Sequence, residues 1–400
     1  MGHIAMDFGD HDFLRDHIRS ILDFYAPGIV DANGGFFQNF RDDGSVFNPG
    51  ERHLVSSCRM VVNYCRAFEL FGDEAYLDLA KHGLEFIRLR HWDDAREGYN
   101  WTLRDGAIAD DQTNHCYGLA FVVLASAAAS KVGLEGARAD LDRAWDIMEG
   151  RLFDRDIGLY ADEASPDWSK VGPYRGQNAN MHSCEAFIEA FEATGEQRFL
   201  ERAAELARLV SVELAAKSDG LVWEHFTPAL EIDWEYNRQD PKNLYRPWGF
   251  QPGHQTEWSK LMLTLHDLRP EDWMLQRARE LFDRAVEVAW DRDRGGILYG
   301  FAPDKTICDD DKYFWVQAES FAASARLFGR TGDPQYKDWY DRIWRYAWDH
   351  MVDHEHGAWF RVLTADNQKY SDEKSTAGGK CDYHTIGACW DVLRSDVSWT

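Results

Sequence analysis

A short motif occurs six times in this chain: a polar cluster, a glycine, and then a run of aromatic or aliphatic residues that is typical of a strand. The copies are DANGGFFQNF (31–40), DAREGYNWTL (94–103), DRDIGLYADE (154–163), KSDGLVWEHF (217–226), DRDRGGILYG (291–300) and DHEHGAWFRV (353–362). Their aligned glycines, Gly35, Gly98, Gly158, Gly220, Gly296 and Gly357, are 63, 60, 62, 76 and 61 residues apart. This period indicates six copies of one supersecondary unit. Each copy is typical of a helix end, a glycine turn and a short strand.

Two helical segments belong to each repeat. They are predicted at 11–26, 53–72, 74–92, 113–131, 134–153, 178–193, 195–216, 252–268, 271–292, 311–330, 333–351 and 382–395. Segment 195–216 has apolar residues at i, i+3, i+4 and i+7, which is typical of a helix with one exposed face. Segment 113–131 is apolar on nearly all sides, which predicts burial. Half-polar and apolar helices therefore alternate.

Six helical hairpins can form either an open stack or a closed ring, and an open stack needs polar caps at both ends. The first predicted helix carries the apolar residues Phe13, Leu14, Ile18, Ile21, Leu22 and Tyr25, and the last repeat is no more polar than the middle ones. We therefore predict an all-α fold, an (α/α)6 barrel of six helical hairpins with short β-hairpin-like connections and the apolar helices inside. We expect a single domain over residues 1–400, with residues 1–10 disordered or derived from a tag.

The fourth repeat interval is longer than the others and places an insertion at 227–251, rich in Asp, Asn, Pro and Tyr. A loop of this length in a compact domain is usually functional, often as a lid. Trp248 lies in this loop and is expected to be a lid residue that contacts substrate or a surface anchor.

The amino-acid composition limits the classes of ligand that this protein can bind. The 400 residues are 44% hydrophobic, which is enough for a core, and 44 Lys and Arg against 69 Asp and Glu give a net charge of -25. Such a surface repels phosphate backbones, so nucleic acid is not expected as a partner. The 17 tryptophans fit either a large core or a site where indole rings stack on sugars. A neutral small molecule is the favoured ligand.

The seven cysteines cannot all pair within the chain, and none forms a CxxC motif. They favour a reducing compartment. The sequence contains no N-terminal cleavage pattern and no apolar run long enough to span a membrane. We therefore expect a cytoplasmic protein without a membrane partner, as a monomer or a homodimer.

Every predicted inner helix carries polar or ionisable side chains near its N-terminal end, at a similar distance from the preceding motif glycine. They are Arg59, Asp111, His115, Tyr117, Asn180, His182, His254, Glu257, Glu319 and His384, with Trp315 one turn before Glu319. Equivalent positions in a closed ring lie at the same height, so these groups should converge at one mouth of the barrel. The alternative for each histidine is a core or capping role, and for Arg59 an ion pair with a core carboxylate.

His254 and Glu257 are spaced i, i+3 and share a helix face. Glu257 is expected to orient the imidazole and raise its basicity, unless it caps its own helix. A divalent metal is the competing interpretation. However, HExxH and EF-hand patterns are absent, and Arg59 is unfavourable beside a cation, so we expect no metal. Phosphate-binding glycine loops and the GxSxG elbow are also absent.

Six blocks resemble the N-acylglucosamine 2-epimerase superfamily, in order and over essentially the whole chain. They are RHLVSSCRMVVNY (52–64), DQTNHCYGLAFVV (111–123), NANMHSCEAF (178–187), RPWGFQPGHQTEWSKLM (246–262), YFWVQAESFAA (313–323) and KCDYHTIGACWDV (380–392). They are most similar to its aldose–ketose isomerase branch, whose members act on mannose or sulfoquinovose. The resemblance implies the (α/α)6 barrel and no nicotinamide or metal cofactor. Val55 stands where the sulfoquinovose type carries Trp, which favours mannose.

The resemblance also implies that His254 and His384 are the acid/base pair. It implies a sugar pocket lined by Arg59, Tyr117, Asn180, His182, Glu257, Trp315 and Glu319. Asp111 and Trp248 are added as substrate-binding candidates from their positions.

These groups fit an isomerase that interconverts D-mannose and D-fructose, or also D-lyxose and D-xylulose, by proton transfer through a cis-enediolate. Histidine has a pKa near 6.5, which suits this transfer. We expect His384 to move the proton between C2 and C1, and His254, oriented by Glu257, to open the sugar ring. Arg59 offers a positive fork to the O1 or O2 oxygens.

Three alternatives stay open. A 2-epimerase of the mannose/glucose type would use the same enediolate with protonation on both faces of C2. An (α/α)6 glycoside hydrolase would need two carboxylates across a bond, and Asp111, Glu257 and Glu319 are candidates. A non-catalytic sugar-binding protein on the same barrel is the third.

Overall fold

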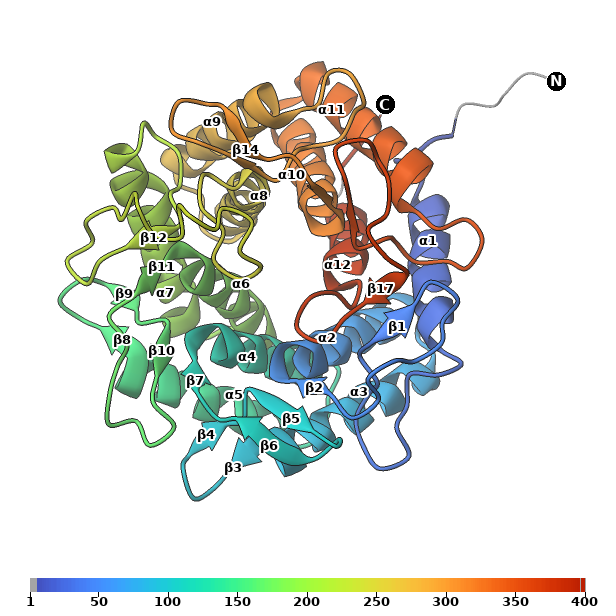
Figure 1. Ribbon diagram of the computed structural model, residues 1–400, viewed down its shortest axis with the longest axis vertical. Coiled ribbons are helices and arrows are strands. Elements are labelled where there is room, and N and C mark those ends of the chain that lie inside the picture. Colours follow the sequence, from blue (N-terminus) through green and yellow to red (C-terminus); the bar gives the residue numbers. More distant parts are fainter. Residues whose placement is uncertain (1–5, 396, 400) are drawn as a thin grey trace.

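The computed structural model describes residues 6–395 and 397–399. Twelve α-helices in this part of the chain form two concentric rings (Figure 1). The inner ring consists of α2 (Leu54–Phe71), α4 (Cys116–Lys131), α6 (Gln177–Thr194), α8 (Pro252–Leu268), α10 (Phe314–Thr331) and α12 (Tyr383–Arg394). The outer ring consists of α1 (His11–Tyr25), α3 (Glu74–Phe86), α5 (Ala137–Ile147), α7 (Gln197–Arg208), α9 (Asp272–Ala289) and α11 (Pro334–Tyr346). The predicted (α/α)6 barrel, with apolar helices inside, is confirmed.

Each inner helix packs against the next one around the ring, and α12 packs against α2. The close hairpins are an inner helix followed by an outer one, such as α2 and α3. In this hairpin Gly72 joins the two helices; it ends α2 at φ 68°, in the left-handed region that favours glycine. The first helix has no inner partner before it and packs against the last, α12. The Tyr25 hydroxyl donates to Asp382 across this seam at 2.6 Å. The ring therefore closes by pairing the two ends of the chain.

Short antiparallel strands cover one end of the barrel. The pairs are β1 (Phe40–Arg41) with β17 (Glu373–Ser375), β3 (Trp92–Asp93) with β4 (Gly98–Tyr99), β7 (Asn114–His115) with β10 (Glu163–Ala164), β8 (Phe153–Asp154) with β9 (Leu159–Tyr160), β11 (Arg175–Gly176) with β12 (His225–Phe226), β13 (Gly300–Phe301) with β14 (Ile307–Asp309) and β15 (Lys312–Tyr313) with β16 (Val362–Leu363), while β2 (Arg52–His53), β5 (Thr102–Arg104) and β6 (Ile108–Asp111) form one three-stranded sheet. Several pairs join neighbouring repeats, and β1 with β17 joins the first to the last. The strands thus brace the same end at which the inner helices begin.

The repeated glycine motif forms the predicted turn. Gly158, for example, has φ 76° directly before β9. The second repeat differs, because Glu97 takes the positive φ of 52° and Gly98 lies in β4. A Cβ on Gly98 would lie 2.5 Å from Asn114 Oδ1, so this glycine permits a close approach rather than a turn.

Four outer helices continue into a π-helical turn before this motif, a feature that the apolar periodicity did not predict. These turns are Ile87–His91, Met148–Leu152, Leu209–Leu214 and Ala347–Met351, and a 3-10 turn, Ala215–Lys217, follows the third of them. The predicted outer segments were correspondingly longer than the α-helices.

The prediction that residues 1–10 are disordered is wrong for Phe8. Phe8 is buried because it packs against α1 and α11, where its ring contacts Phe13 and stacks on Trp344, both at 5.5 Å. Residues 1–5 lie outside the described residues. All seven cysteines are free, and Cys308 is the one among them that is partly exposed. Within the described residues, no helix combines the length and the apolar character needed to cross a lipid bilayer.

Candidate active site

Eight of the residues singled out from the sequence form one cluster inside the ring, in the first two turns of the inner helices; six are buried, and Tyr117 and Trp315 are half-buried. The first turns contribute Tyr117, His254, Trp315 and His384, and the second turns Arg59, His182, Glu257 and Glu319. The members contact one another: Arg59 Nη2 lies 2.9 Å from the Tyr117 hydroxyl, and the Trp315 ring lies 5.1 Å from the His254 ring and 5.8 Å from the His384 ring. The predicted convergence of these eight groups is therefore observed.

His384 is held by a carboxylate at one nitrogen and lies beside a guanidinium group at the other. Its Nδ1 lies 2.7 Å from Glu319 Oε1, and its Nε2 lies 3.4 Å from Arg59 Nη2. Burial lowers the pKa of His384 to about 4, against the opposing effect of Glu319. A neutral imidazole that donates from Nδ1 to a carboxylate has its lone pair on Nε2, beside Arg59. This is the arrangement of a general base.

His254 is oriented by Glu224, and the expectation that Glu257 orients it is wrong. His254 Nδ1 lies 2.9 Å from Glu224 Oε1 and 3.0 Å from Gln177 Nε2. Glu224 lies in the fourth glycine motif, directly before β12, so it reaches the start of α8 from outside that helix. Glu257 is one turn further along α8 and faces His182, whose Nε2 is 3.9 Å from its Oε1. Spacing on one helix could not reveal a partner supplied by another segment.

Glu257 is buried, and neither carboxyl oxygen has a hydrogen-bond partner among the residues that the structure describes. Burial, and next to it the charge of Glu319, raise the pKa of Glu257 well above its usual value. A neutral carboxylic acid can donate a hydrogen bond as well as accept one. Glu257 therefore offers both functions to a ligand in the cluster.

His182 repeats the pattern of His384 on the neighbouring side. Its Nδ1 lies 2.9 Å from Glu185 Oε2, and Tyr383 donates to the other oxygen of Glu185 at 2.7 Å. Burial lowers the pKa of His182 as well. The cluster thus holds neutral imidazoles whose Nδ1 atoms face carboxylates.

Asn180 does not line the cluster, which corrects the assignment made by resemblance. Its side-chain amide bonds the backbone N–H and C=O of Tyr160 and the C=O of Gly176, at 2.9, 3.2 and 2.9 Å. Gln255 and Gln317 hold Val222 and Ile297 in the same way in later repeats. The amide at this repeated position ties an inner helix to its own glycine motif, so its spacing reflects fold rather than chemistry.

Asp111 and Trp248 make their contacts outside the cluster. Asp111 Oδ1 accepts the N–H of Thr113 at 2.8 Å, at the end of β6. Trp248 donates its indole N–H to the carbonyl of Trp234 at 2.7 Å, and its ring lies 6.1 Å from Trp223. In this structure Trp248 anchors its own loop. A substrate contact of either residue stays a prediction.

The insertion 227–251 forms the predicted loop, with β12 ending just before it. Lys242 fastens its middle to the next repeat, since its Nζ lies 3.3, 3.0 and 3.2 Å from carboxylate oxygens of Asp309, Asp310 and Asp311. Arg246 reaches back to Glu163 at 2.9 Å. The loop is therefore tied to repeats on both sides.

Three groups in the described part of the chain have donor atoms close enough to hold a metal ion. Asp309, Asp310 and Asp311 form one outside the cluster, where Lys242 pairs with them. The other two overlap in the cluster and are His182, Glu185 and Glu257, and Glu257, Glu319 and His384. Two cations lie beside them, Arg59 next to His384 and Lys260, which pairs with Glu319. A metal ion at Glu257 would have to displace the proton that the raised pKa of this carboxyl favours. The donor set fits hydrogen bonding to a neutral ligand better than metal coordination.

Known proteins match this chain along its whole length. Residues 35–388 match the profile of the N-acylglucosamine 2-epimerase (GlcNAc 2-epimerase) family. A D-mannose isomerase of Marinomonas mediterranea is 50% identical over 97% of this chain and 98% of its own, and one of Thermobifida fusca is 34% identical over 94% and 92%. A crystal structure of a D-mannose isomerase superposes with a TM-score of 0.95 at 49% identity, covering 97% of this chain and 99% of that one.

Proposed function

This chain belongs to the N-acylglucosamine 2-epimerase family, and we propose that it is an aldose–ketose isomerase that interconverts D-mannose and D-fructose. The observation that supports this most is the neutral His384, with Nδ1 on Glu319 and Nε2 beside Arg59. The high identity to D-mannose isomerases over the full length supports the same substrate.

In the proposed mechanism His254 acts first; Glu224 orients it, and the Trp315 ring lies beside it at 5.1 Å. It assists the proton transfer that opens the pyranose. His384 Nε2 then takes the proton from C2, and Arg59 stabilises the negative charge that develops on the enediolate oxygens. His254 moves a proton from the O2 hydroxyl to O1, and His384 returns its proton to C1 on the same face, which gives the ketose. Glu257 donates a hydrogen bond to a substrate oxygen.

Incubation of the protein with D-mannose, followed by analysis of the sugar products, tests the proposal. Fructose is expected, and the same mixture should form from fructose. Glucose as the main product would indicate a 2-epimerase and contradict the proposal, as would an unchanged sugar. A His384→Ala variant is the control for contaminating activity.

Activity should survive exhaustive dialysis against EDTA, since Arg59 lies beside His384 and Lys260 pairs with Glu319, which places positive charge next to two of the candidate metal ligands. The assay is the initial rate on mannose before and after dialysis, with and without added Mn²⁺ or Co²⁺. Loss of activity that either ion restores would contradict proton transfer by His384 alone.

The free cysteines fit a reducing compartment, and we assign the enzyme to the cytoplasm. Fractionation of cells that make the protein at native level tests this assignment.

A further inference from the structure

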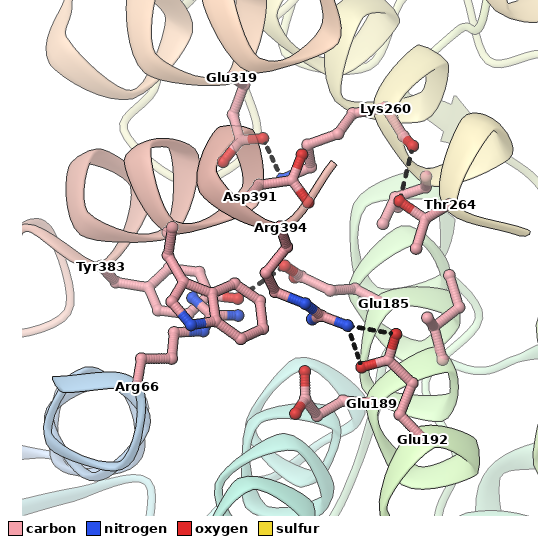
Figure 2. A pocket seen from close by; sticks show the side chains of 14 residues that line it. Arg66, Glu185, Glu189, Glu192, Lys260, Thr264, Glu319, Tyr383, Asp391 and Arg394 are labelled. Atoms are coloured by element: carbon pink, nitrogen blue, oxygen red, sulfur yellow. Dashed lines mark hydrogen bonds and ion pairs between the residues drawn. The ribbon is translucent and has the colours of Figure 1, made fainter. Parts of the chain in front are cut away.

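A cavity of about 50 Å³ lies inside the barrel, deeper along the inner helices than the histidine cluster (Figure 2). Its lining is highly charged and includes Arg66, Glu185, Glu189, Lys260, Glu319 and Asp391. Glu185 and Glu319 belong to both regions, because each also holds the Nδ1 of a histidine in the cluster. The cavity therefore borders the rear side of the proposed site.

Lys260 is the cation that reaches from this cavity to the cluster. It lies on α8 one turn after Glu257, is buried, and pairs with Glu319 through its Nζ (Figure 2). Burial opposes its charge, but Glu319 and then Glu185 outweigh burial and raise the pKa of Lys260. Lys260 is therefore a permanent positive charge at neutral pH, directly behind the carboxylate that holds His384.

The resulting chain of contacts is Lys260 to Glu319 Oε2, and Glu319 Oε1 to His384 Nδ1. Burial alone would raise the pKa of Glu319, but Lys260 and next His384 hold it below its usual value. An ionised Glu319 can only accept, so His384 must donate from Nδ1 and keep its lone pair on Nε2. The same positive charge opposes protonation of His384.

We propose that Lys260 is a positioning residue that keeps His384 neutral and basic at Nε2 by keeping Glu319 ionised. This inference rests on the function proposed above. Lys260 has no contact with the sugar in this scheme and acts through Glu319.

The other charged and titratable groups that face the His384–Glu319 pair come from five inner helices. They are Arg59 on α2, Tyr117 on α4, His182 and Glu185 on α6, Glu257 on α8, and Tyr383 and Asp391 on α12. Asp391 is paired with Arg326, so with Glu257 neutral the carboxylates of Glu185 and Glu319 are balanced by Lys260 and Arg59. Removal of Lys260 leaves one buried negative charge in excess, and the pair then takes up a proton.

On either group, this proton leaves His384 without a free lone pair on Nε2, so His384 can no longer act as the base. A proton on His384 gives an imidazolium paired with Glu319, and a proton on Glu319 allows the imidazole tautomer with hydrogen on Nε2. The two groups titrate together, so the change is expected in the pH dependence of the pair. The acid limb of kcat/KM should move to higher pH.

The test compares Lys260→Met with Lys260→Arg and with Lys131→Met. Lys131 is the matched control, because it is another lysine among glutamates, 2.8 Å from Glu189 Oε1, but none of its ion pairs involves a carboxylate that holds a histidine. For each variant, the kcat/KM for mannose is measured from pH 5 to 9. The tautomer and pKa of His384 are measured by ¹⁵N NMR, with assignment by a His384→Gln spectrum.

In Lys260→Met, the acid limb should move up by at least about one pH unit, and kcat at pH 7 should fall at least about tenfold. KM should change less than kcat. Lys260→Arg keeps the charge and should keep the wild-type acid limb, and Lys131→Met should keep it too. If Lys260→Met does not fold, Lys260→Gln carries the same expectation.

An unchanged acid limb and an unchanged His384 tautomer in the neutral variants would overturn the proposal, as would an equal shift in Lys131→Met. The NMR measurement does not need turnover. Failure of the wild-type enzyme to isomerise mannose would therefore count against the proposed function, while the state of His384 would still decide the role of Lys260.

Discussion

His254 and His384 share one arrangement, with Nδ1 on a carboxylate and Nε2 turned away from it. The carboxylates are Glu224 and Glu319, which come from different parts of their repeats. Fixing Nδ1 fixes the tautomer, so both rings are prepared to exchange protons at Nε2. What distinguishes them is Arg59, which lies 3.4 Å from Nε2 of His384.

We predict that this difference separates their roles in isotope exchange. His384→Ala should lose isomerisation and also the exchange of the C2 hydrogen of mannose with solvent, since no base remains beside Arg59. His254→Ala should lose turnover of the closed ring by about 10²–10⁴-fold but keep exchange on the open-chain fraction. NMR of mannose C2 and fructose C1 in D₂O measures both. Exchange retained by His384→Ala and lost by His254→Ala would reverse the assignment.

Glu257 provides a second prediction at this scale. Because its pKa is raised and its carboxyl is neutral, Glu257→Gln should keep the hydrogen-bonding capacity of the site and lower kcat/KM less than tenfold. Glu257→Ala removes this capacity and should cost about 10²-fold or more. Steady-state kinetics on mannose compare the two. A Gln variant as inactive as the Ala variant would mean that the charged form is required.

The identity of most cluster residues could be predicted because they occupy repeated positions near helix starts. Their partners could not, since the contact between His254 and Glu224 depends on how a strand approaches a neighbouring helix. Asn180 shows the opposite error: it has the expected spacing, but its amide satisfies backbone groups of Tyr160. A polar residue at a repeated position can bond the backbone of its own repeat instead of lining the site. Only the orientation of its side chain distinguishes these two roles.

At the scale of elements, the helices were predictable to within a few residues at most boundaries. Segment 252–268 agrees with α8 at both ends, because Pro252 marks its start and the apolar pattern defines its face. The π-helical turns were not predictable, since each is a single turn at the end of a helix and is too short to show a period of its own.

A prediction at the scale of elements concerns the mobility of the insertion 227–251. Lys242 joins the loop to Asp309, Asp310 and Asp311, so Lys242→Ala should free its middle. Amide hydrogen exchange in the loop should become about fivefold faster, which corresponds to about 1 kcal/mol for a small surface network. The exposed Lys170 on another loop is the control. Mannose should slow exchange in the wild-type loop if it closes over substrate, and equal exchange with and without sugar would contradict a lid role.

At the scale of the whole molecule, the repeats predict a ring, but closure needs contacts that no local pattern contains. Helix α1 must pack on α12, and residues far apart in sequence must meet there. His17 on α1 accepts a hydrogen bond from the indole N–H of Trp359 at 2.7 Å, and Tyr25 donates to Asp382. The seam between the chain ends thus depends on a histidine that must be neutral to accept.

The seam should therefore weaken in acid. Burial lowers the pKa of His17 to about 4, while the unfolded chain titrates near 6.5. Between these values the unfolded state binds the extra proton, so the stabilising contribution is complete above about pH 6.5 and is lost as the pH falls toward 4. The buried His53 and His91, with pKa values lowered by burial to about 3 and about 4, act in the same direction.

We predict that the free energy of unfolding, measured by urea denaturation at pH 7, 6 and 5, decreases with falling pH, and that His17→Gln makes this decrease shallower. The Gln carbonyl can accept from Trp359 but does not titrate. The slope between pH 6 and 5 should become smaller by about 1.4 kcal/mol per pH unit, the effect of one proton. His11→Gln, at an exposed position of the same helix, should keep the wild-type slope. If His17→Gln also keeps it, His17 does not control the acid sensitivity of the seam, and closure depends on the apolar contacts of α1 and on Tyr25.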